Sequence, residues 1–128
     1  MQKYTRHHIL YPHRLWQKSY SGDDKKRAAF LRGKFIIKLP EELHAELHQH
    51  VDAMLPQIVI AAHAPSPATV TKIYLICRKI EDEIDALTAI EKIEWLIERF
   101  DPADQTNESV LLCLSAQLDF LKAHEVEY

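Results

Sequence analysis

The sequence predicts an α+β protein whose strands lie in the first 40 residues and whose remainder is helical. Two short β-compatible segments, residues 5–10 and 34–39, carry the strand signal, the second with β-branched residues at its centre. After residue 67, apolar residues recur at spacings of three and four, which is typical of amphipathic helices. A chain of 128 residues with 47% hydrophobic residues is expected to form one compact domain.

The first half is expected to alternate strands and helices. The expected elements are a strand over residues 5–10, a helix over 25–32, a strand over 34–39 and a helix over 41–54. Asp23 or Asp24 is expected to cap the first helix and Gly33 to end it. Pro40 stops the second strand, and the two glutamates after it favour the start of a helix.

The second half is expected to form about three helices. The apolar spacing predicts one long helix from Pro67 to about Leu87. Thr88 and Glu91 form a capping-box pattern that begins a shorter helix, and Asn107 or Thr106 can cap the last one. The expected organisation is a basic unit over residues 1–54, a proline-containing connector over 55–67 and an acidic helical bundle over 68–128 packed on the basic unit.

The net charge of −3 is divided unevenly along the chain. Residues 1–40 contain ten Lys and Arg against two Asp and Glu, whereas residues 41–128 contain six against seventeen. A basic segment with interleaved aromatic residues is typical of nucleic-acid binding. The candidate phosphate contacts are Arg6, Arg14, Lys18, Lys25, Lys26 and Arg27. The alternative is that this segment docks on the acidic helices of the same chain or of a second copy.

Histidines form two groups in the first half. His44 and His48 are four residues apart on an expected helix, so that their imidazoles project from one face and can bind one ion. His7 and His8 lie on the first expected strand and point to opposite faces of it. One of this pair can therefore complete a three-histidine metal site while the other faces away from the metal.

The double histidine, the strand ending near Leu39-Pro40 and the segment His44-Ala-Glu-Leu-His48 resemble the ββα-metal finger of HNH nucleases, also called the His-Me finger. The resemblance covers about residues 5–50. It implies that His7, His44 and His48 hold one divalent ion, either zinc or another transition ion, with magnesium as a further option. It also implies that His8 is the general base of a DNA endonuclease that hydrolyses phosphodiester bonds.

The chain departs from the family pattern in two ways. The family's middle asparagine normally orients the general base, yet the only asparagine here is Asn107, outside the motif. The 35 residues between His8 and His44 also form a long basic insertion. Either a backbone carbonyl or another side chain orients His8, or the finger has kept its shape, with or without its metal, and lacks efficient catalysis.

Two other functions compete with the nuclease. One is a non-enzymatic module that binds DNA or protein, with a structural metal or none. The other uses the acidic amphipathic helices as a surface for a homodimer or a protein partner. We expect a cytoplasmic protein without a membrane partner, because Cys77 and Cys113 form no CxxC motif and no apolar run approaches the roughly 20 residues of a bilayer span.

Overall fold

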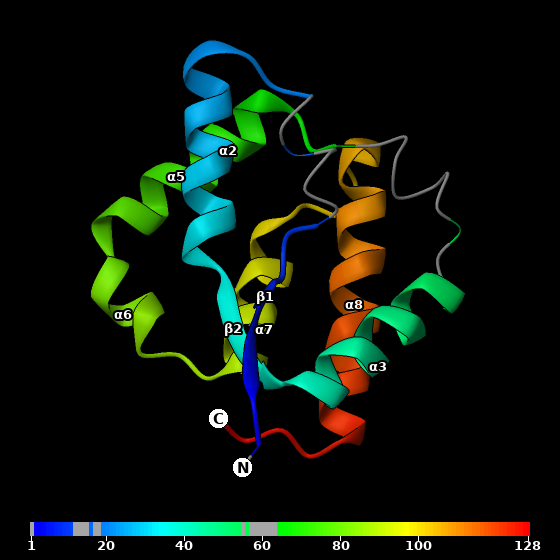
Figure 1. The fold of residues 1–128 in the computed structure, drawn as a ribbon. Helices are drawn as coiled ribbons and strands as arrows, with labels where there is room; N and C mark the ends of the chain where they lie inside the picture. Colours follow the sequence, from blue (N-terminus) through cyan, green and yellow to red (C-terminus); the bar gives the residue numbers. More distant parts are fainter. Residues whose placement is uncertain (1, 12–15, 17–18, 55, 57–63) are drawn as a thin grey trace.

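The computed structural model describes residues 2–11, 16, 19–54, 56 and 64–128. It confirms the α+β class, because a small antiparallel sheet at the start of the chain is followed mainly by helices (Figure 1). The elements are β1 (Tyr4–His8), α2 (Gly22–Lys34), β2 (Ile36–Pro40), α3 (Glu41–Met54), α5 (Pro67–Lys79), α6 (Glu81–Asp85), α7 (Ala89–Arg99), the 3₁₀ helix η1 (Gln105–Asn107) and α8 (Glu108–Ala123).

The two strands pair antiparallel and connect the start of the chain to α3. Their register sets Thr5 opposite Leu39 and His7 opposite Ile37. Both strands lie within one or two residues of their expected bounds. Beyond the register, the backbone N–H of Glu41 donates to the Lys3 carbonyl at 2.8 Å. The sheet therefore holds the first turn of α3 beside β1.

Helices from both halves of the chain share one hydrophobic core. Figure 1 shows the sheet between α2, α5 and α6 on one side and α3 and α8 on the other. Helix α5 packs on α2, while α8 packs on both α7 and α3. Phe35, Leu47, Ile93 and Leu114 are all buried in this core. The C-terminal helices therefore pack directly on the N-terminal elements.

Helix α2 is longer than expected at both ends. It begins at Gly22, whose φ of +57° suits glycine, with Ser21 at the N-cap position. The expectation that Asp23 or Asp24 caps this helix was wrong, since both lie in its first turn. Gly33 was also wrongly expected to end it. The helix continues to Lys34, whose ammonium group lies 2.9 Å from Asp85 and 3.4 Å from Glu81.

The expected long helix after Pro67 is interrupted at Ile80, where φ is −131° and ψ is 34°. The sequence has no glycine or proline at this position, and the helical spacing of apolar residues continues across it, so the sequence pattern gives no sign of the interruption. The interruption begins α6 with three acidic residues in its first turn, where the helix dipole favours negative charge. Glu81 also reaches Lys34 across the molecule. The prediction of a single helix to Leu87 was therefore wrong.

The helix starts at Thr88 and Asn107 were expected, but they are stabilised differently. Thr88 Oγ1 accepts from the Glu91 N–H at 3.3 Å, and the Glu91 carboxylate accepts from the Thr88 N–H at 3.0 Å, which confirms the capping box. Asn107 occupies the N-cap position of α8 without a side-chain cap. Its side chain instead donates to the Asp101 carbonyl at 3.1 Å.

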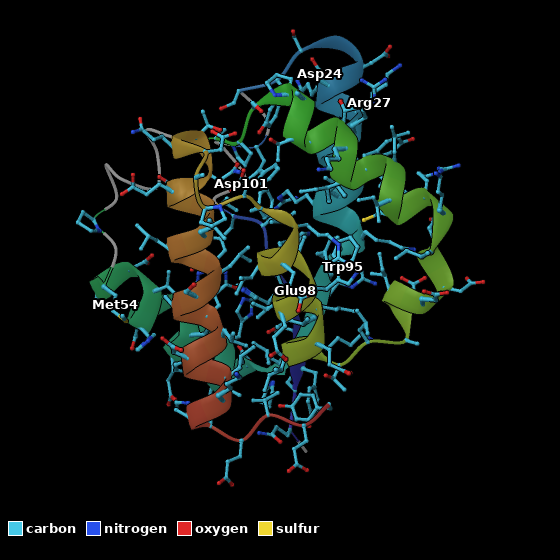
Figure 2. All side chains as sticks on the ribbon, turned by 180° about the vertical axis from the view of Figure 1, so that it is seen from behind. Asp24, Arg27, Met54, Trp95, Glu98 and Asp101 are labelled. Carbon is cyan, nitrogen blue, oxygen red and sulfur yellow. The ribbon has the colours of Figure 1, made fainter. Side chains whose placement is uncertain are left out.

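Aromatic and thiol side chains fill the space between the sheet and the C-terminal helices. Trp95 lies on α7 (Figure 2). Phe35 stacks on Trp95 with ring centroids 5.5 Å apart, and the Arg99 guanidinium lies 4.3 Å from the Trp95 ring centroid. Cys77 and Cys113 are buried free thiols.

Within the described ranges, no helix combines the length and apolar character needed to cross a membrane.

Candidate metal centre

Three histidines from β1 and α3 converge on one point. The four-residue spacing on α3 brings His44 Nε2 to 3.1 Å from His48 Nε2. His7 Nδ1 on β1 lies 3.1 Å from the same His44 Nε2. The ligand atoms of the three side chains all lie within 4.8 Å of one another. Two nitrogens bound to one tetrahedral zinc ion are about 3.3 Å apart, so these residues lie close enough to hold a metal ion.

The hydrogen bonds of Gln117 determine which nitrogen of His7 carries the hydrogen. The Gln117 amide group donates to the Ile9 carbonyl at 3.0 Å and to the Cys113 carbonyl at 3.3 Å. Its oxygen therefore faces His7 Nε2, at 2.7 Å. Because an amide oxygen only accepts, Nε2 of His7 is the donor. His7 Nδ1 then presents its lone pair to the other two histidines.

Thr5 has the same effect on His44. Its hydroxyl lies 3.4 Å from the Leu39 carbonyl and 2.7 Å from His44 Nδ1, and both contacts are hydrogen bonds when the hydroxyl donates to the carbonyl and accepts from His44 Nδ1. The lone pair of His44 is then on Nε2, which faces His7 Nδ1. Two lone pairs at this separation repel each other unless a cation lies between them. In this arrangement, two lone pairs face a point that a bound cation could occupy.

Burial favours the neutral form of His7 and His44. His7 is only 1% exposed, and burial lowers its pKa to about 3, with repulsion from His48 and His44 acting in the same direction and the Gln117 hydrogen bond opposing them. Burial also lowers the pKa of His44, as do the nearby His48 and His8. Neutral imidazole is the form that binds metals, so a metal ion suits this site better than a proton at neutral pH.

A pocket of about 350 Å³ opens onto the three nitrogens. It is lined by Arg6, His7, His8, Tyr11, Arg32, His44 and His48. His8 is half-buried, as expected from its alternation with buried His7, yet it lines the same pocket. The Tyr11 ring packs with its centroid 5.0 Å from that of His48. Burial raises the pKa of Tyr11, so that its phenol stays neutral.

Arg32, in the last turn of α2, lines this pocket and has an unsatisfied donor. Its Nε is buried and has no hydrogen-bond partner among the residues that the structure describes. Burial lowers the pKa of this guanidinium, although an arginine still remains charged at neutral pH. Arg6 lies at the same pocket and is exposed. Two guanidinium groups beside a potential metal site favour an anionic ligand.

The candidate phosphate contacts are spread over several places. Arg6 lies at the pocket, whereas Lys25 and Lys26 are exposed on α2. Arg27 lies on α2 with Asp24, its ion-pair partner at 3.3 Å (Figure 2). Arg14 and Lys18 lie outside the described residues. Within the described part of residues 1–40, only Lys34 forms an ion pair with the acidic helices, so self-docking involves one residue of this segment.

Sequence reasoning found the three converging histidines but missed four residues of the site: Thr5, Tyr11, Arg32 and Gln117. Thr5 had a usable signal, because it lies two positions before His7 and so faces the same side of the strand. Gln117 is 110 positions from His7 and had no such signal. Elsewhere in the described ranges, no other group of three potential ligands comes together.

No protein-family model matches the chain, and comparisons with curated proteins and with solved structures likewise find no match. The chemistry of the pocket must therefore be argued from its own residues.

Proposed function

We propose that this protein is an HNH-like, metal-dependent endonuclease that binds DNA and hydrolyses its phosphodiester bonds. Zinc or another transition ion would be held by His7, His44 and His48. The observation that carries this proposal is the convergence of two imidazole lone pairs, each oriented by its own hydrogen bond, in a pocket that also contains two arginines. A metal ion held there would act as a Lewis acid, and the two arginines would bind a phosphate group.

The basic side chains of the pocket would bind the scissile phosphate. The Arg32 guanidinium would donate to a phosphate oxygen, and Arg6 would neutralise a second charge at the pocket. A bound divalent ion would stabilise charge on the phosphoryl oxygen and on the leaving 3′ oxygen. The exposed Lys25 and Lys26 are about 10 Å of helix rise from Arg32, a distance that corresponds to about three base-pair steps of DNA.

His8 would act as the general base of the reaction. It lines the pocket without belonging to the three converging histidines. In the proposed step, His8 takes a proton from water, and the water oxygen attacks phosphorus. The bond between phosphorus and the 3′ oxygen breaks, and that oxygen takes a proton from solvent. The products are a 5′ phosphate and a 3′ hydroxyl group.

One observation favours a second candidate, a DNA-binding module with a structural metal. Asn107 donates to the Asp101 carbonyl and is not among the residues that line the pocket. It therefore does not replace the asparagine that orients the base in the family that the sequence resembles. A base without this support spends less time aligned with water, which can lower the rate by orders of magnitude.

Plasmid cleavage distinguishes the two candidates. Purified protein is incubated with supercoiled DNA and, in separate reactions, magnesium, manganese, nickel or zinc. The nuclease proposal expects nicked or linear DNA, loss of cleavage in His48→Ala, and at least tenfold slower cleavage in Arg32→Gln with metal content unchanged. Lys79→Gln, on the exposed face of α5, serves as the matched control for loss of one positive charge. Wild-type protein that binds both metal and DNA but leaves the plasmid intact contradicts the nuclease and supports the module.

A further inference from the structure

Gln117 lies in the interior of the protein in the middle of α8. Its side chain is 0% exposed, and apolar side chains of the same helix, including Leu114, Phe120 and Leu121, are buried with it. A polar side chain in such a position is unfavourable unless its hydrogen bonds are satisfied. The polar atoms of Gln117 are satisfied, by the Ile9 and Cys113 carbonyls and by His7. The polar atoms of Gln117 therefore connect α8 to His7 on β1 and to the adjacent Ile9 carbonyl.

The Gln117 amide can be oriented in only one way in this environment. Two carbonyl oxygens, from β1's continuation at Ile9 and from α8 at Cys113, both require the NH₂ group. The amide oxygen is left facing His7 Nε2. A flipped amide would set its oxygen against two carbonyl oxygens and its NH₂ group toward the histidine. The network thus has a direction, from the backbone through Gln117 to the imidazole.

We propose that Gln117 is a positioning residue of the metal centre, which holds His7 in the tautomer with hydrogen on Nε2 and a lone pair on Nδ1. This inference rests on the proposed metal site. Without Gln117, the ring of His7 can rotate or place its hydrogen on Nδ1, and that tautomer cannot bind metal through Nδ1. The C-terminal helix is therefore part of the centre, and residues 1–54 alone lack one of its orienting groups. Removal of a hydrogen-bond partner of a metal-binding histidine typically lowers metal affinity 10- to 100-fold.

Three variants of the full-length chain test this role. Gln117→Met keeps the approximate volume and removes the acceptor. Gln117→Glu keeps an oxygen that can accept from His7 Nε2, and its second oxygen, protonated in this buried position, can donate to the Ile9 carbonyl. Leu121→Val, a buried position on the same helix that has no hydrogen bond to His7, controls for a general loss of packing in α8. Cobalt and zinc affinities are measured by competition with a chromophoric chelator, and thermal unfolding of each variant reports whether it folds.

The expected pattern separates positioning from packing. Gln117→Met should bind both metals 10- to 100-fold more weakly than wild type, whereas Gln117→Glu should remain within about fivefold and Leu121→Val should be unchanged. Equal affinities for wild type and Gln117→Met would overturn the inference and leave the proposed metal site intact. A similar loss in Leu121→Val would also overturn it, because the effect would then come from packing alone.

The tautomer itself can be read without metal and without activity. Two-bond ¹H–¹⁵N correlation spectra of metal-free wild-type protein should show His7 with a protonated Nε2 and an unprotonated Nδ1. A His7 that is protonated on Nδ1 would overturn the inference even if Gln117→Met does not fold. If wild-type protein shows the expected tautomer but binds neither cobalt nor zinc, the proposed metal-dependent function fails, and so does the assignment of Gln117 to a metal centre.

Discussion

His7 Nε2 and Gln117 Oε1 are 2.7 Å apart although their residues are separated by 110 positions in the sequence. The first strand and the last helix therefore meet at the histidine cluster. Thr5 orients His44 from the opposite side of the same cluster. His7 and His44 are thus oriented by contacts from both ends of the chain.

Replacement of His44 by alanine should abolish metal binding. His44 Nε2 lies between His7 and His48, so its loss leaves two imidazoles without the shared neighbour that joins them. His124→Ala is the control, because His124 is the exposed residue that directly follows α8, and it contacts the Phe120 carbonyl. Elemental analysis after dialysis against zinc should find about one ion per chain in the control and background in His44→Ala. Equal metal content in both variants would refute the site.

Zinc should stabilise the folded protein. A ligand at 100 times its dissociation constant adds about 2.7 kcal/mol to the free energy of unfolding if it binds only the folded state. For a chain of this size, this corresponds to an increase of roughly 10 °C in Tm. Differential scanning calorimetry with zinc and then with excess chelator measures the shift. A wild-type Tm that does not respond to zinc, or a response that persists in His48→Ala, contradicts binding at this centre.

The metal-free protein should lose stability as the pH falls below about 6.5. The pKa of His7 is about 3 in the folded protein, against about 6.5 in the unfolded chain, so the unfolded state binds the extra proton between these values. Stability from this residue is therefore present above pH 6.5 and should fall by roughly 1.5 kcal/mol between pH 6.5 and 5. Urea denaturation in chelator measures it. His7→Gln should have a flatter dependence, and an unchanged slope in that variant would contradict the assignment.

Charge reversal on α2 should weaken DNA binding. Replacing Lys25, Lys26 and Arg27 by glutamate removes up to three phosphate contacts, so the affinity at low salt should fall at least tenfold and depend less steeply on salt. The matched control reverses Lys72, Arg78 and Lys79 on α5, which changes the net charge equally. Fluorescence anisotropy at several salt concentrations compares them. An equal loss in both triple variants would mean that net charge alone, and not the surface of α2, governs binding.

His8→Ala should separate metal binding from cleavage. His8 lines the pocket but lies outside the group of three converging nitrogens, so its removal should leave the metal content unchanged. If His8 is the base, plasmid cleavage should fall by at least a factor of 100. Cleavage at the wild-type rate in His8→Ala would reject His8 as the base. Loss of metal along with activity would show instead that His8 supports the ligand set.

Several features of the molecule follow from local sequence patterns. The four-residue spacing of His44 and His48 on one helical face, the position of His7 on a strand and the capping box at Thr88 depend on contacts within a few residues. Local dihedral preferences and side-chain periodicity are sufficient to predict such features. The α+β order and the three converging histidines were therefore predictable from the sequence.

The tertiary structure alone decided how these parts are completed. Helix α2 continues past Gly33 to Lys34, which reaches Glu81 and Asp85. The helix after Pro67 breaks at Ile80, and Glu81 begins α6. Gln117 reaches His7 because α8 packs against α3 and the end of β1. Each of these contacts joins distant segments, and sequence periodicity carries no information about which segments meet. The local sequence pattern predicts which residues can bind a metal. The tautomers in which these histidines can bind it depend on long-range packing.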